Sequence, residues 1–136
     1  MTKEQQDTWL AAIFDGEGHF DVQAKGSHPH IGIKIVQVYS DELLEKIKEV
    51  TGYGKVDPGL QWRTHSTNEV KNFIDRVRPY LIVKQYECKL LEAITATFVQ
   101  QGYHPTPQAL VYRDRLMQLW EDRPTSRKSK KVKNVK

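Results

Sequence analysis

The stretch of sequence that decides the fold is Leu10-Ala11-Ala12-Ile13-Phe14-Asp15-Gly16-Glu17-Gly18. Six consecutive apolar residues from Trp9 to Phe14 predict a helix that is buried on nearly all sides. Two carboxylates follow, Asp15 and Glu17, and the glycines beside them allow close backbone approach and unusual dihedral angles. The stretch therefore predicts a buried helix that ends at the glycines, with the Glu17 carboxylate emerging from its end.

An alternation of apolar and polar residues begins directly after this helix. It predicts a hairpin of two half-buried strands over residues 20–25 and 31–36, and a second hairpin over residues 54–65 around the turn Pro58-Gly59. Helical periodicity and capping signals predict helices after Ser40, after Ser66, over residues 84–101 and over residues 107–120. This order predicts a two-layer α+β domain over residues 1–122, in which helices cover one face of a four-stranded antiparallel sheet.

The other face of this sheet is expected to be uncovered and polar. The residues predicted to line it are Asp21, Gln23, Lys25, Lys34, Gln61, Arg63 and His65. A solvated antiparallel sheet is often polar on its outer face for no further reason, so the pattern alone does not establish a binding surface. Trp62 alternates to the inner face and is predicted to be a core residue.

Composition narrows the class of protein. No apolar run approaches the roughly 18 residues of a membrane span and no signal-peptide pattern opens the sequence, which indicates an intracellular protein (cytoplasm, nucleoid or organelle matrix) with no membrane partner. The single cysteine, Cys88, excludes an internal disulfide framework and a multi-cysteine zinc site.

The net charge of +4 comes from the end of the chain. Residues 123–136 hold seven bases and no acid, whereas residues 1–122 carry 14 bases and 17 acids. We therefore expect residues 123–136 to form a basic, flexible tail, which either contacts a polyanion or is a solvated extension.

The stretch over residues 10–18 resembles the LAGLIDADG motif, the signature of the LAGLIDADG homing endonucleases. The direct matches are Leu10, Ala11, Asp15 and Gly18. Glu17 stands for the second acid of the motif, and Ala12 replaces its usual glycine. The resemblance covers roughly residues 8–100 and includes Gly52-Tyr53-Gly54 and Pro79-Tyr80-Leu81-Ile82-Val83-Lys84-Gln85. It implies a saddle-shaped sheet on a helix-hairpin-helix-hairpin-helix core with additional C-terminal helices.

The motif occurs once, and members of the family with one motif are homodimers. The resemblance therefore implies a second copy of the chain as partner, related by a two-fold axis. The residues expected at the interface are Trp9, Leu10, Ala11, Ala12, Ile13, Phe14 and Asp15. For Asp15 it implies a structural role, in which the carboxylate accepts hydrogen bonds from backbone amides at the partner helix.

The activity implied by the resemblance is site-specific hydrolysis of both strands of a long pseudo-palindromic DNA site, as in intron homing. Glu17 and the Gly16 carbonyl would bind Mg²⁺, for which Mn²⁺ can substitute and which Ca²⁺ can replace without efficient turnover. Lys84 would stabilise the transition state as a further catalytic residue. Gln37 would orient an active-site water.

By the same resemblance, double-stranded DNA would be read in its major groove by the open sheet face. The residues expected to contact DNA are Asp21, Gln23, Lys25, Ser27, Lys34, Lys55, Asp57, Gln61, Arg63 and His65. Two alternatives use the same fold: an RNA-binding intron maturase, and a DNA-binding regulator that no longer cleaves. The acid at Glu17 and the match at Lys84 favour the nuclease, because a protein that only binds needs neither.

Overall fold

One antiparallel sheet organises the computed structural model, which describes residues 1–23, 30–98 and 105–124. Within these residues the strands lie in the order β1 (Gly18–Gln23), β2 (His30–Val36), β4 (Gln61–Thr64) and β3 (Lys55–Asp57). All three neighbouring pairs are antiparallel. The predicted α+β architecture with a four-stranded antiparallel sheet is confirmed in the part of the chain that is described.

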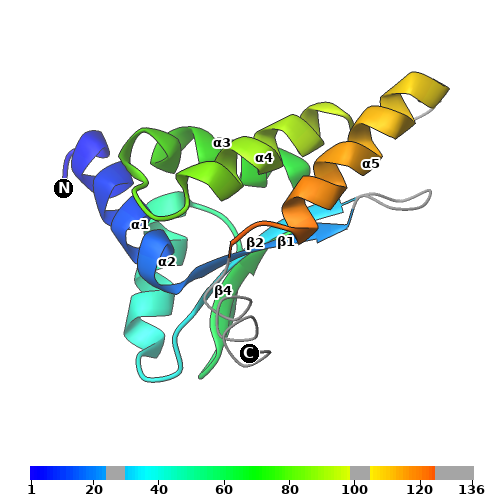
Figure 1. The fold of residues 1–136 in the computed structure, drawn as a ribbon. Helices are drawn as coiled ribbons and strands as arrows, with labels where there is room; N and C mark the ends of the chain where they lie inside the picture. Colours follow the sequence, from blue (N-terminus) through cyan, green and yellow to red (C-terminus); the bar gives the residue numbers. More distant parts are fainter. Residues whose placement is uncertain (24–29, 99–104, 125–136) are drawn as a thin grey trace, which may run out of the picture.

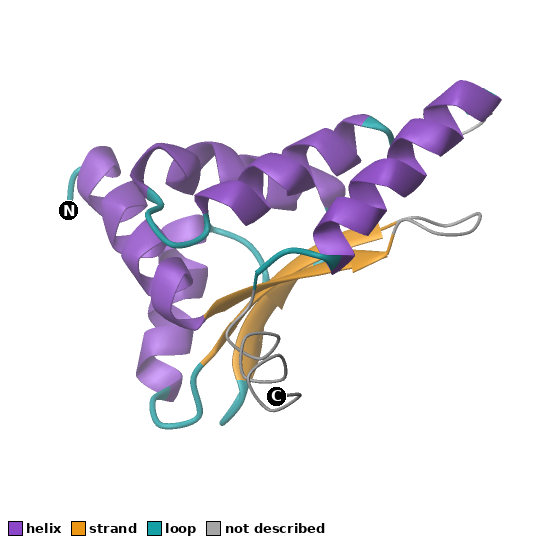
Figure 2. Cartoon of the chain, viewed as in Figure 1, coloured by secondary structure: helices purple, strands orange, loops and turns teal. Residues whose placement is uncertain are grey.

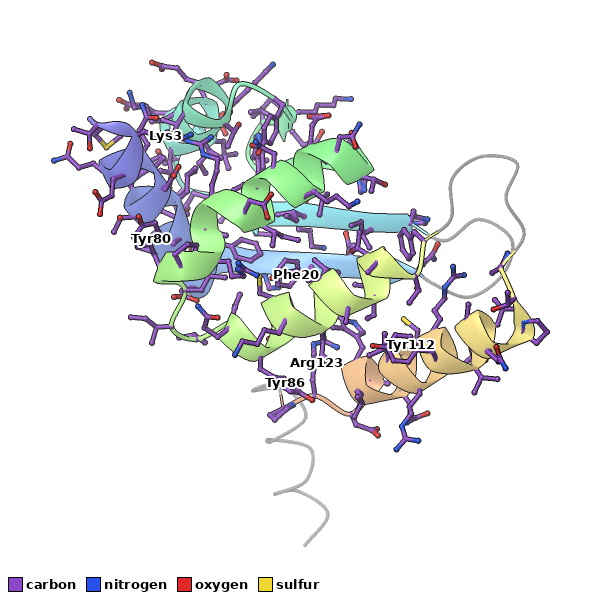
Figure 3. The ribbon with its side chains drawn as sticks, turned by 90° about the horizontal axis from the view of Figure 1, so that it is seen from above. Lys3, Phe20, Tyr80, Tyr86, Tyr112 and Arg123 are labelled. Atoms are coloured by element: carbon purple, nitrogen blue, oxygen red, sulfur yellow. The ribbon has the colours of Figure 1, made fainter. Side chains whose placement is uncertain are left out.

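The helices pack on one side of this sheet (Figures 1 and 2). They are α1 (Lys3–Glu17), α2 (Asp41–Thr51), α3 (Thr67–Val77), α4 (Gln85–Ala96) and α5 (Pro107–Glu121), with a short 3₁₀ turn η1 (Arg78–Tyr80) after α3. Seen from above, α3 and α4 lie over strands β1 and β2, and Phe20 of β1 is visible between the two helices (Figure 3). No helix in the described ranges is long and apolar enough to cross a membrane.

A line of aromatic side chains joins the helices to the inner face of the sheet. The Phe14 ring of α1 lies 4.8 Å from the Phe20 ring of β1 and 5.4 Å from the Phe73 ring of α3, measured between centroids. Trp62, fully buried on the inner face as predicted, lies 5.6 Å from Phe73. The two contacts of Phe14 are edge-to-face, an arrangement that stabilises the fold beyond the burial of apolar area. These contacts fix the C-terminal half of α1 against the start of β1.

Helix α1 ends at the predicted glycines. It continues through Gly16 to Glu17, and Gly18 is the cap, whose N–H donates to the Phe14 carbonyl. A side chain at Gly18 would overlap the Phe14 ring, so the close approach of helix and strand requires glycine there. Chain direction therefore changes within one residue, and Glu17 sits at the corner between α1 and β1.

Helix α4 is shorter than the predicted 84–101. It ends at Ala96, because the Thr97 hydroxyl donates to the Ile94 carbonyl (2.6 Å) and the Arg113 guanidinium donates to the Thr97 carbonyl (2.6 Å). These bonds occupy carbonyls that another helical turn would use. Residues 99–101 of the predicted span lie outside the described residues.

The folded domain extends slightly past the predicted boundary at residue 122. The Arg123 guanidinium lies 3.9 Å from the Trp120 ring centroid and 3.3 Å from a Glu87 carboxylate oxygen on α4 (Figure 3). Arg123 therefore belongs to the packed domain and is not a free base of the tail. Residues 125–136 lie outside the described residues.

Candidate active site and nucleic-acid interface

The Asp15 carboxylate binds three successive backbone amides that precede α4. Its oxygens accept from the N–H groups of Ile82 (2.8 Å), Val83 (3.1 Å) and Lys84 (3.0 Å). A run of backbone N–H groups that converge in this way is a typical site for an anion. The expected partner-helix role of Asp15 is therefore corrected: the amides belong to its own chain, because the chain returns from η1 to the end of α1.

The Lys84 side chain reaches the end of α1, and its predicted catalytic role stays a prediction. Its Nζ donates to the Asp15 backbone carbonyl at 3.3 Å. That carbonyl is in the last turn of α1, which contains no basic residue of its own and carries the negative end of the helix dipole. Lys84 thus makes two hydrogen bonds to Asp15: its backbone N–H donates to the carboxylate, and its ammonium donates to the carbonyl, which directly precedes Gly16 in the chain.

Glu17 is the exposed acid of this corner. Its carboxylate makes no hydrogen bond or ion pair with any residue of the described ranges, and the Gly16 carbonyl is among the last carbonyls of α1, which have no partner within the helix. Both groups offer hard oxygen ligands at the negative end of a helix, which suits Mg²⁺. Two protein ligands are few, but Mg²⁺ keeps several waters and often completes its coordination shell with substrate phosphate. The residues present therefore fit a divalent cation.

No group of three or more His, Cys, Asp or Glu side chains that could hold a metal gathers among the residues the structure describes. A complete site built from such side chains of one chain is thus not seen there. The metal ligands predicted from the sequence, Glu17 and Gly16, remain a proposal.

Gln37 follows directly after the end of β2, the strand whose residue Ile35 pairs with Gly18 at the start of β1. Its side-chain oxygen accepts from the Tyr39 amide at 2.9 Å, and its backbone N–H donates to the Leu60 carbonyl. The carboxamide NH₂ is left to bind water, and the predicted role of Gln37 stays a prediction.

Sequence reasoning missed His19, which follows the motif directly. It is exposed on the open sheet face, pairs across the strands with Lys34, and has a pKa below the ordinary histidine value. Partial desolvation of the imidazole by its neighbours is the largest cause of the lowered pKa, and the charges of Lys34 and Lys84 act in the same direction. The alternation that placed Asp21 on this face, continued two residues back, would have found it.

The open face of the sheet carries a row of nitrogen-bearing side chains that crosses every strand of the described sheet. The register aligns His19 with Lys34, Lys34 with Arg63, and Arg63 with Lys55. We call these four residues the central row. It gives the uncovered face a positive stripe, although residues 1–122 are net acidic.

The other residues predicted to contact DNA flank the central row or lie outside the described residues. Asp57 pairs with Gln61 on one side of the row, and on the other side Asp21 pairs with Gly32, against which the His65 ring lies. Gln23 is also exposed, at the end of β1. Lys25 and Ser27 lie outside the described residues.

One face of helix α1 packs against the core of the chain, and the opposite face points away from it. Leu10, Ala11 and Phe14 are fully buried within the chain, so they are not available to a partner. Ala12 and Gly16 are exposed and Trp9 is half-buried, and these three follow a helical spacing. A side chain at Gly16 would meet nothing within 4 Å, and the residue does not have positive φ, so the single chain gives no reason for glycine there.

No protein-family model and no curated protein sequence matches the chain. Solved structures do. The archaeal intron-encoded homing endonuclease I-Vdi141I complexed with DNA matches with a TM-score of 0.72 and 21% identity over 91% of this chain and 87% of that one. The homing endonuclease I-CvuI, in complex with its target in the presence of Ca, matches with 0.67 and 18% over 86% and 83%.

The LAGLIDADG meganuclease I-AabMI bound to uncleaved DNA matches with a TM-score of 0.67 and 21% identity, over 81% of this chain but only 43% of that one. The chain thus corresponds to almost all of some neighbours and to less than half of another. The resemblance noted in the sequence is confirmed at the level of structure: the chain has the LAGLIDADG homing endonuclease fold.

Proposed function

We propose that this protein is a divalent-metal-dependent, site-specific DNA endonuclease that acts as a two-fold symmetric homodimer. The proposal rests on the residues at the corner between α1 and β1. There the Glu17 carboxylate is exposed and free of partners among the described residues, at the start of an open sheet face with a positive stripe. At the same helix end the Lys84 ammonium donates to the Asp15 carbonyl. Neighbours with the same fold are homing endonucleases bound to DNA.

Glu17 and the Gly16 carbonyl are the groups that would hold the cation. When bound, a divalent cation supplies Lewis-acid polarisation of a phosphate oxygen and lowers the pKa of bound water. The chain's own residues supply the rest: Lys84 places a positive charge where negative charge develops on the phosphate, and Gln37 orients water through its carboxamide. Asp15 keeps Lys84 in position through the amides it binds.

DNA would lie against the open sheet face, with the strands in the major groove. The central row supplies positive charge for phosphates and, in Arg63, the side chain best suited to guanine. Glutamine side chains at Gln23 and Gln61 suit adenine. Strand β1 of this face begins directly after Glu17. A duplex bound to the face would therefore have a phosphate close to the Glu17 carboxylate.

The proposed dimer is supported by the single motif and by the exposed face of α1. Ala12 and Gly16 leave a shallow strip along the exposed side of the helix, where a second α1 can approach closely. The fraction of each neighbour that the chain spans supports this, because it covers nearly all of I-Vdi141I but less than half of I-AabMI. Two copies would place two Glu17 carboxylates near one axis, one for each DNA strand.

Ala12→Glu should convert the dimer into a monomer at micromolar concentration without unfolding the chain. Ala12 is exposed in the single chain, so the glutamate costs little there, whereas two glutamates would meet at the axis. Sedimentation velocity measures the mass, and Lys3→Glu, an exposed change elsewhere on α1, is the control and should stay dimeric. A wild-type protein that sediments as a monomer with and without DNA would contradict the proposed assembly.

Arg63→Ala should weaken binding to the specific site by about 1–3 kcal/mol and relax the base preference at one position in each half-site. Removal of residues 125–136 takes away six bases and should instead weaken binding to all sequences equally and flatten the salt dependence. Fluorescence-anisotropy titrations at several salt concentrations, on specific and scrambled duplexes, separate the two effects. A truncation that changed the preferred base would show that these roles are misassigned.

The function itself is tested by incubating the protein with a randomised DNA library and Mg²⁺ and sequencing the cut ends. The proposal predicts double-strand breaks at one long, pseudo-palindromic site. A site that is enriched by binding but never cut would favour a regulator, and tighter binding to structured RNA than to any duplex DNA would favour a maturase. Either result would overturn the proposed nuclease.

A further inference from the structure

Three polar side chains of the β3–β4 hairpin form a connected unit on the open face. One oxygen of Asp57, Oδ2, accepts hydrogen bonds from Gln61 Nε2 at 3.0 Å and from Arg63 Nε at 2.8 Å. Asp57 lies directly across the hairpin from Gln61, and Arg63 is two residues further along the same strand face. We call these three residues the hairpin triad.

The geometry leaves the recognition groups of the triad free. Asp57 occupies Arg63 Nε, while the Nη groups of Arg63 make no hydrogen bond with any residue in the described ranges. Those Nη groups are donors that can reach a guanine edge. Gln61 directs its NH₂ toward Asp57, which turns its carbonyl oxygen away as an acceptor, with the second amide hydrogen still available.

The hairpin that carries the triad is itself firmly held. The turn amide of Gly59 donates to an Asp41 carboxylate oxygen at the start of α2 (2.6 Å), and Gln37 N–H donates to the Leu60 carbonyl (2.9 Å). Trp62, between the two donor residues, is fully buried on the opposite face, and its indole N–H donates to the Tyr53 carbonyl. Gln61 and Arg63 therefore project from a strand that is held in place by contacts at its turn and on its inner face.

A carboxylate on a surface that receives DNA is unfavourable unless it is neutralised, since it repels phosphates. Here the hydrogen bonds from Gln61 and Arg63 lower the pKa of Asp57, so the carboxylate stays ionised and its charge is matched by the guanidinium. The carboxylate is only about a quarter exposed, at 27% relative side-chain area. Its Oδ2 is occupied by the two donors from its own chain.

We propose that Asp57 is a positioning residue that sets base specificity through Arg63 and Gln61 without contacting a base itself. The inference rests on the proposed DNA-binding function. Two long side chains that are already oriented lose less conformational entropy when they bind, and they reject bases that a mobile arginine would accommodate. Asp57 thus acts on which sequence is chosen more than on how tightly DNA is bound.

The test compares Asp57→Ala with the wild type in two measurements. The first needs no DNA: in nitrogen-15 NMR spectra of the free protein, the Arg63 Nε proton should exchange slowly with solvent, and Asp57→Ala should make it fast. The second is a binding selection from randomised duplexes. Asp57→Ala should lower the preference for the best base by about tenfold at one or two positions per half-site, with no loss of affinity for random DNA.

A double-mutant comparison separates positioning from direct contact. In a Gln61→Ala/Arg63→Ala background, adding Asp57→Ala should change no base preference further. Lys55→Ala, on the same hairpin but outside the triad, should lower affinity for all sequences without changing the preferred bases. Thermal melts verify that every variant is folded.

Three results would overturn the inference. These are fast exchange of the Arg63 Nε proton in the wild type, an unchanged base profile in Asp57→Ala, or a further change of base preference when Asp57→Ala is added to the double variant. The last would make Asp57 a direct contact. A wild-type protein that enriches no duplex at all would contradict the proposed function, whereas the NMR result tests the triad independently of DNA.

Discussion

Asp15→Asn should lower the free energy of unfolding by about 2–3 kcal/mol and slow DNA cleavage by at least about a hundredfold. The Asp15 carboxylate accepts from three amides, and those of Ile82 and Lys84 hold the chain as it enters α4. An asparagine has one acceptor oxygen, and its NH₂ would face a backbone N–H. Because these bonds fix the backbone of Lys84, its ammonium would lose its position at the end of α1.

The measurement combines chemical denaturation with single-turnover cleavage. Asp114→Asn, at an exposed position on α5, is the matched control and should change neither quantity. Because Asp15 binds amides of its own chain, the loss of stability should not depend on protein concentration. Normal stability together with normal cleavage would show that the contacts to residues 82–84 are unimportant.

Much of the fold could be predicted because its signals are local. The alternation after Gly18 and the buried Trp62 follow from side-chain periodicity, and the capping residues Ser40 and Ser66 accept the hydrogen bonds expected of them. The end of α4 could not be predicted in this way. It depends on Arg113, which comes from a helix later in the chain and binds the Thr97 carbonyl.

The candidate site, like the fold, could be predicted only where its signals are local in sequence. A motif and its neighbours indicated Glu17 and Lys84, but no local pattern says which amides Asp15 will bind, since they are 67 to 69 residues away in sequence. Alternation placed Gln61 and Arg63 on the open face, and the resemblance added Asp57 as a DNA contact. Only the structure shows that a single carboxylate oxygen of Asp57 accepts from both neighbours. His19 was missed because the strand begins two residues earlier than the alternation indicated.

Glu17→Gln should reduce cleavage of both strands by several orders of magnitude while specific DNA binding persists. The change keeps the size and polarity of the side chain but removes the charge that would hold a divalent cation. Because two identical chains form the proposed enzyme, both sites change together. Stability should be unaffected, since the carboxylate bonds to no residue among those described. Binding should be equal or tighter, because a charge that repels phosphates is lost.

The most direct test of the catalytic role of Glu17 is therefore a paired assay on one selected DNA site, with cleavage measured in Mg²⁺ and binding measured in Ca²⁺. Wild-type protein should cut both strands in Mg²⁺. Glu17→Gln should bind with equal or higher affinity in Ca²⁺ and fail to cut in Mg²⁺, and Glu121→Gln, an exposed change on α5, should behave as wild type. A Glu17→Gln protein that cuts at nearly the wild-type rate, or one that loses binding and cleavage together, would contradict the catalytic role assigned to Glu17.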